Sequence, residues 1–241
     1  MRAETRHQLK QDAFSRATLG AAEKTVHWSV EHRGTLVRAA VAVAVVLAIV
    51  LGGWYYLSAQ DEKASVVLGQ GIRTLDTPLR PAGTPAQPDT PTFDSAKERA
   101  DAAKKQFQTI VDNYPHTHTA DTARYFLAVT ATSSGDAAGA ERSFKEVASS
   151  GGAEVASLAR LALANIYGSS NRTKDAVDLY QQIIAKPTNS VGKVTSQLQL
   201  AALYQSSNQP LEAKRLYEEI KKDNPGNETG QLAAQKLSEL K

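Results

Sequence analysis

The sequence predicts an all-α protein in which one N-terminal transmembrane helix is followed by an α-solenoid of about four degenerate helix pairs and a C-terminal capping helix. Two observations predict this fold. A group of three side chains recurs four times, at steps of 37, 36 and 37 residues, and such a period is typical of solenoids built from helix pairs. Ahead of the repeats, nineteen residues without a charge are enough to cross a hydrocarbon core of about 30 Å as a helix.

The recurring group is a small residue, an aromatic residue four positions later and a branched aliphatic residue three positions after that. Residues spaced by three and four lie on one face of a helix, so each group predicts the buried face of the second helix of a pair. We therefore interpret the groups as core, with repeats centred on their alanines. The groups are Ala103, Phe107, Ile110; Ala140, Phe144, Val147; Ala176, Tyr180, Ile183; and Ala213, Tyr217, Ile220.

The helix ahead of each of the last three groups also follows a pattern. A leucine is followed by alanine and, three residues later, by alanine or tyrosine: Leu127, Ala128, Ala131; Leu163, Ala164, Tyr167; Leu200, Ala201, Tyr204. The small residue lets two helices approach closely. Both patterns together resemble the tetratricopeptide repeat (TPR), and Pro115 and Pro225 match its closing proline. The middle two repeats lack that proline and all exceed the 34-residue norm, which implies degenerate units. An irregular helical bundle with coincidental spacing is the alternative.

The apolar run predicts a membrane anchor over residues 36–58. Trp54, Tyr55 and Tyr56 cluster at one end of the run and Arg38 lies at the other, as expected where side chains meet the membrane–water boundary. A cleaved signal peptide is the first alternative, but 38 residues precede the run and no A-x-A site follows it. A buried core helix is the second alternative, and nineteen uncharged residues beside an aromatic cluster fit it poorly.

The charge distribution predicts the orientation of the anchor. The first 38 residues hold seven of the 28 Lys and Arg residues and four of the 25 Asp and Glu residues. The rest of the chain therefore carries 21 basic and 21 acidic residues and is neutral. Basic residues stay on the cytoplasmic side. We therefore predict a cytoplasmic basic amphipathic tail over 1–35 and a periplasmic repeat domain over 59–241, in a single-pass protein of the bacterial inner membrane. Trp28 of the tail would rest in the headgroup layer, unless the tail serves topology alone.

Composition and motifs argue against several function classes. The part beyond the anchor is neutral and carries no basic stripe, so nucleic-acid binding is not expected. The chain has no cysteine, which removes thiol chemistry and Cys-ligated metals. His116, His118 and Asp121 could hold a metal weakly, but turn residues with a helix N-cap at Thr119 or Asp121 are the preferred interpretation. The sequence therefore predicts no metal, no cofactor and no enzymatic activity.

Two further segments complete the predicted domain. Residues 59–75 predict a helix that continues from the anchor, with Leu68, Gly69 and Ile72 in first-helix spacing, so this helix pairs with residues 94–114 in the first repeat. Residues 77–93 hold five of the nine prolines and predict an exposed loop, either a disordered insertion or a docking strap. Residues 228–240 predict a cap in which Leu232, Leu237 and Leu240 cover the last repeat.

The first helix of each TPR pair lines the concave side of a solenoid, so its inward positions are the candidate binding residues. They are neutral and partly apolar, which suits an extended polypeptide or an apolar helix. A carboxylate clamp needs Lys and Asn here, and only Asn165 matches. Packing against the terminal helix or a second copy is the alternative role. The candidate residues are Tyr125, Val129, Thr132, Leu161, Asn165, Leu198, Ala202 and Gln205.

The combination of features resembles the ancillary SecYEG translocon subunit family, the YfgM-type TPR proteins. These features are the L-K-Q-D-A-F segment from Leu9 to Phe14, the anchor near residue 40, the Pro-rich insertion and three further degenerate repeats. The resemblance implies partners at the export channel: SecYEG, periplasmic chaperones and translocating polypeptides. A structural TPR subunit of a cell-envelope or cell-division complex is the alternative. The sequence leaves the oligomeric state open.

Overall fold

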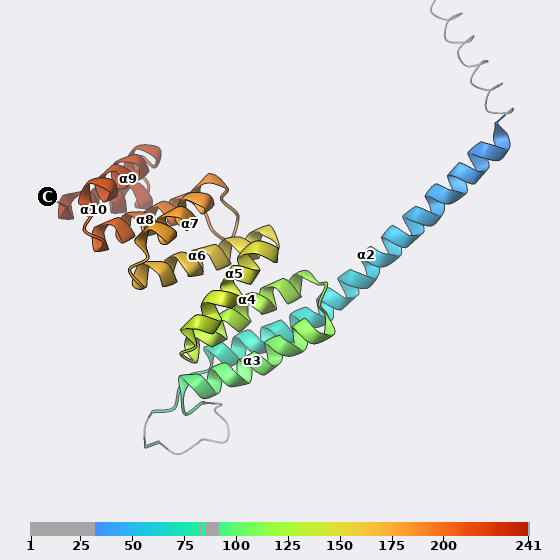
Figure 1. The fold of residues 1–241 in the computed structure, drawn as a ribbon, viewed down its shortest axis with the longest axis horizontal. Coiled ribbons are helices and arrows are strands. Elements are labelled where there is room, and N and C mark those ends of the chain that lie inside the picture. The colour runs from blue at the N-terminus through green and yellow to red at the C-terminus, as the bar shows by residue number, and fades with distance from the viewer. Residues whose placement is uncertain (1–31, 82, 85–91, 241) are drawn as a thin grey trace, which may run out of the picture. The chain divides into compact units, whose positions relative to one another are not determined.

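The chain is helical in a computed structural model that describes residues 32–81, 83–84 and 92–240 (Figure 1). The helices are α2 (Arg33–Asp76), α3 (Ala96–Asn113), α4 (His118–Ser133), α5 (Ala137–Ser150), α6 (Ala153–Ser169), α7 (Thr173–Ala185), α8 (Lys193–Ser206), α9 (Pro210–Asp223) and α10 (Glu228–Glu239). Over the described residues the only β pairing is an isolated bridge between Leu79 and Phe93. The predicted all-α class is therefore confirmed. Most of the predicted tail, with Trp28, lies outside the described residues.

The chain divides into two compact units, Met1–Tyr56 and Leu57–Lys241. In the first unit, α2 carries the apolar run, with a mean hydropathy of 2.5 over 18 residues and none of that window buried. Trp54, Tyr55 and Tyr56 are exposed, and Arg38 Nε donates to Gly34 O at 3.2 Å. By length and composition, α2 can span a membrane. The boundaries 36–58 stay a prediction, since α2 continues without a break past both.

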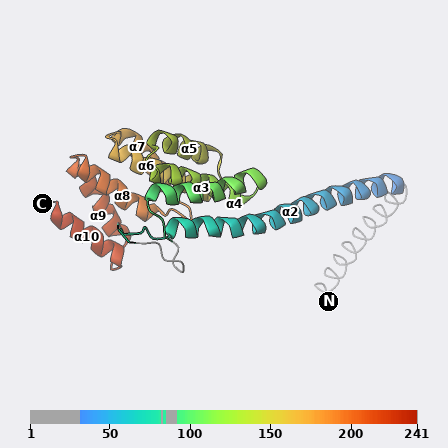
Figure 2. The same cartoon turned by 90° about the horizontal axis from the view of Figure 1, so that it is seen from below.

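The second unit consists of helix pairs that follow one another in chain order from α3 to α10 (Figure 2). The end of α2 packs with α3, and the next pairs are α4 with α5, α6 with α7 and α8 with α9. The recurring groups form the core of this stack, because none of their twelve side chains is more than 3% exposed. Ala128, Ala164 and Ala201 of the first helices are fully buried opposite them, as close helix approach requires.

In α2, the first helix of the first pair, the glycine packed against the neighbouring helix is Gly71 and not Gly69, which the sequence pattern indicated. Gly69 has only the Arg73 guanidinium within 4 Å of a Cβ placed on it, whereas a Cβ on Gly71 would meet the Phe107 ring. Gly71 is buried, and Ala64, two helical turns earlier, is fully buried. The Phe107 ring stacks on Phe126 with 5.1 Å between centroids. That stacking leaves room for a glycine only.

The cap also differs from the prediction in one residue. Leu232 of α10 is 41% exposed, and the residue buried on that helix is Ala233. Leu237 and Leu240 do pack on the last core cluster. The reason is helical spacing, because residues 233, 237 and 240 share one face of α10 and residue 232 lies about 100° away from it.

The proline-rich segment is closed at its base. Arg80 N donates to Phe93 O at 2.8 Å, and the Arg80 side chain forms an ion pair with Asp94. Arg99 of α3 donates to Thr77 O at 2.8 Å. These contacts bring the two ends of the predicted loop together beside α3. Residues 82 and 85–91 of the loop lie outside the described part of the chain.

Ser157 of α6 provides a test of the buried part of the repeat domain. Its hydroxyl is buried and has no hydrogen-bond partner in the described part of the chain. An unpartnered buried hydroxyl is destabilising, and alanine favours a helix more than serine does. We expect Ser157→Ala to raise the free energy of unfolding by about 1 kcal/mol in denaturant titrations of the full chain in detergent.

Ser196 is the matched control for that substitution. It is also buried on a first helix, but its hydroxyl donates to Gly192 O at 3.1 Å. Ser196→Ala should therefore lower the free energy of unfolding by about 1 kcal/mol. Equal effects of the two substitutions would contradict the placement of Ser157.

Candidate binding groove

The first helices α4, α6 and α8 border two hollows that meet at Asn165. The smaller hollow has a volume of about 270 Å³ and the larger about 560 Å³. The smaller is lined by Tyr125, Val129, Thr132, Ser133, Phe144, Ala162, Asn165 and Ile166. The larger is lined by Ala164, Asn165, Gly168, Ser169, Tyr180, Gln199, Ala202, Leu203 and Ser206. We call the two hollows together the groove.

Five of the eight predicted binding residues line the groove. They are Tyr125, Val129, Thr132, Asn165 and Ala202. Binding at these positions stays a prediction.

The other three predicted residues have different surroundings. Leu161 packs on the central core cluster and Leu198 on the last one. Gln205 lies one turn after Ala202 and accepts a hydrogen bond from Tyr217. Leu161 and Leu198 are large aliphatic residues within reach of a neighbouring helix, and they bury their side chains there rather than line a hollow.

The interpretation of the second-helix groups as core alone was incomplete. Phe144 and Tyr180 are buried, yet each forms part of the lining of a hollow. Gln199 of α8 also lines the larger hollow and was not predicted. The sequence carries a signal only for Tyr180, which is the change from phenylalanine to tyrosine at the aromatic position of the last two repeats. A tyrosine in a core needs a partner for its hydroxyl.

The hydroxyls of those tyrosines bind amide side chains of the first helices. Tyr180 donates to Asn165 Oδ1 at 2.6 Å and lies 3.2 Å from Gln199 Oε1. Tyr217 donates to Gln205 Oε1 at 2.9 Å. Burial raises the pKa of Tyr180 to about 12, so this hydroxyl keeps its proton at neutral pH and remains a donor. The amide oxygens of Asn165 and Gln205 are therefore occupied.

The smaller hollow is the apolar part of the groove. The Tyr125 ring meets Phe126 edge-on at 5.5 Å and lies 5.6 Å from Phe144. Burial raises the pKa of Tyr125. Val129, Ala162 and Ile166 complete an aliphatic and aromatic surface, which can hold an apolar side chain by burying it.

No charged side chain of the described residues lines the groove. A third hollow of about 280 Å³ between α7, α8 and α9 differs in this respect, because Glu212, Arg215 and Glu219 line it. The groove is therefore suited to an uncharged ligand, since a buried ligand charge would have no partner.

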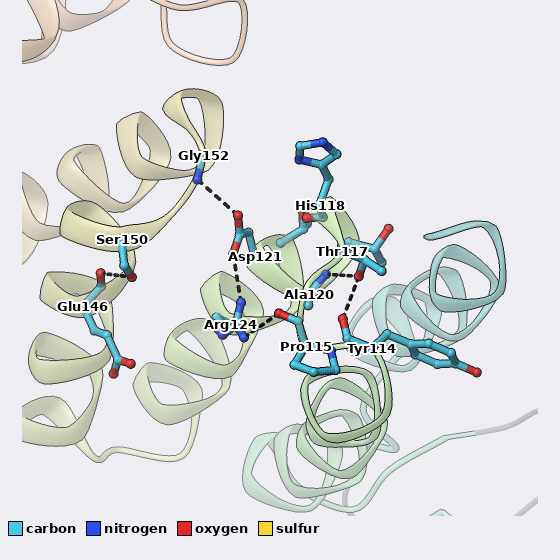
Figure 3. A network of polar contacts seen from close by, with 12 residues as sticks. Tyr114, Pro115, Thr117, His118, Ala120, Asp121, Arg124, Glu146, Ser150 and Gly152 are labelled. Atoms are coloured by element: carbon cyan, nitrogen blue, oxygen red, sulfur yellow. Dashed lines mark hydrogen bonds and ion pairs between the residues drawn. The ribbon is translucent and has the colours of Figure 1, made fainter. Parts of the chain in front are cut away.

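Of the residues considered for a metal, Asp121 binds an arginine and a backbone N–H group of the protein itself. Asp121 accepts from Arg124 at 2.8 Å and from Gly152 N at 3.2 Å, and Arg124 also donates to Pro115 O (Figure 3). His118 is exposed. The N-cap of α4 is Thr117, not Thr119 or Asp121. Among residues 32–81, 83–84 and 92–240, no three His, Asp or Glu side chains are grouped to hold a metal ion.

Asp121 belongs to a series of contacts between successive repeats. Asp61 of α2 accepts from Thr119 N at 2.9 Å, at the start of α4. Asp121 of α4 accepts from Gly152 N ahead of α6, and Glu154 of α6 accepts from Asn189 and Ser190 N ahead of α8. We call Asp61, Asp121 and Glu154 the inter-repeat carboxylates. Each holds backbone donors at or before the start of the next first helix.

A cluster of charged side chains surrounds Tyr167 and lowers the pKa of Glu141. Glu141 accepts from Lys145 at 2.7 Å and from Arg172 at 2.8 Å, and Arg172 lies 3.8 Å from the Tyr167 ring centroid. The hydrogen bonds from Lys145 and Arg172 lower the pKa of Glu141 to about 2. A lowered folded-state pKa stabilises the fold above the unfolded value and loses that effect as the pH falls through the folded value.

We expect the contribution of Glu141 to be complete above about pH 4.5 and to disappear between there and about pH 2. The measurement is the difference in free energy of unfolding between the wild type and Glu141→Gln across that range. The difference should be constant above pH 5 and close to zero at pH 2. A difference that does not change with pH would contradict the pairing of Glu141 with Lys145 and Arg172.

One family model matches most of this chain. A family model described as a tetratricopeptide repeat-like domain matches residues 27–241. Among solved structures, TPR-like repeats of a kinesin light chain-type protein from Podosopora anserina superpose with a TM-score of 0.48 and 17% identity. The match covers 59% of this chain and 78% of that one. A single-residue variant of the same repeats superposes with a TM-score of 0.48 and 16% identity, and that match covers 59% of this chain and 77% of the variant. Among curated proteins there is no significant match. The chain belongs to the tetratricopeptide repeat-like domain family.

Proposed function

We propose that this protein is a non-catalytic interaction module that is held at a membrane by α2 and binds protein partners in the groove. The observation that carries the proposal is the groove itself, two neutral hollows that meet at Asn165. TPR-like repeats typically serve as protein-interaction modules. An uncharged, partly apolar surface on the first helices suits a polypeptide better than a small charged metabolite.

The finer proposal is an accessory subunit of the Sec translocon that links export to periplasmic chaperones. It is supported by the sequence resemblance to the YfgM-type proteins. The excess of basic residues before the apolar run supports an anchor at 36–58 with the tail inside and the repeats in the periplasm. In this arrangement the groove would receive translocating polypeptides or chaperones beside SecYEG.

A photo-crosslinking amino acid at Ala202 tests the proposal in native bacterial membranes. Ala202 is exposed and lines the larger hollow, whereas Leu161 packs on the core and is unsuitable. Ala185, an exposed alanine at the end of α7 away from both hollows, is the matched control.

We expect the probe at residue 202, and not the one at 185, to capture channel subunits, periplasmic chaperones or nascent exported chains. Capture of cell-wall or division proteins alone would exclude the translocon role and favour a structural envelope subunit. Equal capture from both positions would exclude the groove as the contact surface.

A further inference from the structure

The groove contains a hydrogen bond between a tyrosine and an amide that bears on which atoms of a ligand it binds. Asn165 lines both hollows and lies against Tyr180, the tyrosine of the recurring group in its own repeat. Gln205 on the next first helix lies outside the hollows and is held in the same way by Tyr217. Tyr180 and Tyr217 are 3% and 2% exposed. The tyrosine hydroxyls therefore approach the amides from the core side of the helices.

This arrangement fixes the orientation of the amides. A side-chain amide has an acceptor oxygen and an NH₂ group with two donors. Because the tyrosine hydroxyl donates to the oxygen, the oxygen of each amide turns toward the core and the NH₂ group turns away from it. Asn165 is exposed, and its NH₂ group has no partner among the described residues. The centre of the groove thus presents donors.

We propose that the groove binds an extended, uncharged polypeptide segment through its main-chain carbonyl oxygens, with the NH₂ group of Asn165 as the donor. Tyr180 is a positioning residue that holds this amide. An apolar side chain of the segment occupies the smaller hollow, against Tyr125 and Phe144. This inference rests on the proposed function and names the ligand class of its groove.

Two observations favour main-chain carbonyls over other acceptors. Carboxylates are also acceptors, but the lining supplies no Lys or Arg to pair with a charge, and burying an unpaired charge is unfavourable. Carbonyl oxygens recur along any extended segment whatever its sequence. The groove would therefore accept many sequences of low charge and select against folded or strongly charged ones.

The test uses the full chain in lipid nanodiscs and a capped twelve-residue peptide of four Leu-Pro-Pro triplets. This peptide is uncharged and extended, has a carbonyl at every residue and has few N–H donors. Binding is measured by isothermal titration calorimetry. A second peptide with glutamate in place of each leucine tests whether carboxylates are the preferred acceptors.

The informative variant is Asn165→Asp, which keeps an oxygen for the Tyr180 hydroxyl but replaces the outward donors with a second acceptor. We expect it to weaken binding of the Leu-Pro-Pro peptide at least about tenfold. Tyr180→Phe should weaken it by a factor of about three to ten, because Asn165 is then free to turn. Gln182→Glu, at an exposed position of α7 outside the groove, is the charge-matched control, and this variant should bind the peptide like the wild type.

Unchanged affinity in Asn165→Asp would overturn the proposal, since it would mean that the amide does not act as a donor. Tighter binding of the glutamate peptide would overturn it in favour of carboxylates. If neither peptide binds while the crosslinker at Ala202 still captures partners, the ligand class is wrong and the proposed function stands. If Ala202 captures nothing, the proposed function itself fails.

Discussion

Gly71→Val should be among the most destabilising single substitutions in the repeat domain. A Cβ at this position would lie 2.8 Å from Phe107 Cζ and closer still to Cε1. Phe107 is fully buried and stacked on Phe126, so the ring cannot move without displacing a second aromatic side chain. Overpacking of this kind costs about 3 kcal/mol. The measurement is the free energy of unfolding of the full chain in detergent, followed by circular dichroism.

The control is the same substitution two residues earlier. Gly69→Val changes helix propensity by the same amount, but a Cβ there meets only a flexible arginine at 3.9 Å. We expect it to alter the free energy of unfolding by less than about 0.5 kcal/mol. If Gly69→Val were the more harmful of the two, the register of α2 against α3 would be wrong.

Phe144→Ala should be strongly destabilising, because Phe144 belongs to the core cluster shared by the second and third repeats. The side chain is 3% exposed and its ring lies 5.6 Å from Tyr125. Deleting a buried phenylalanine side chain costs about 3–5 kcal/mol through lost burial and the cavity left behind. In a solenoid each repeat contacts only its neighbours. Hydrogen exchange should therefore rise first in α4, α5 and α6, and the same experiment gives the global loss of stability.

Leu211→Ala controls for the removal of apolar atoms. Leu211 on α9 is 72% exposed, so its truncation should change stability by less than about 0.5 kcal/mol. Uniform loss of protection over α3 to α10 in Phe144→Ala would indicate one cooperative core in place of nearest-neighbour coupling.

Much of the core could be predicted because its pattern is local. Ala103, Phe107 and Ile110, and their three counterparts, share a helical face, so spacing alone identifies them as buried. Gly71 could not be chosen over Gly69 in this way. The choice depends on where the Phe107 ring lies across the helix pair, and a contact between residues 36 positions apart has no trace in local spacing.

The groove could be predicted in part for a similar reason. Asn165 and Ala202 could be predicted because they occupy inward positions of the first helices. The leucine followed by alanine in each of these helices fixes which positions face inward. The contribution of Tyr180 depends on a hydroxyl that reaches between two helices to Asn165. The inter-repeat carboxylates escaped prediction because charged residues near helix starts are common, and only the packed structure shows which backbone N–H each one meets.

The inter-repeat carboxylates bear on how successive helix pairs are oriented. Asp61, Asp121 and Glu154 accept hydrogen bonds from backbone N–H groups at or just before the start of the next repeat, whereas the core groups pack within and between helix pairs. We infer that packing holds neighbouring pairs together and that the carboxylates influence the angle at which one pair follows the next. Substitutions such as Glu154→Gln would then alter the shape offered to a ligand more than the stability of the fold. The solenoid could change its fit to a partner while its core remained intact.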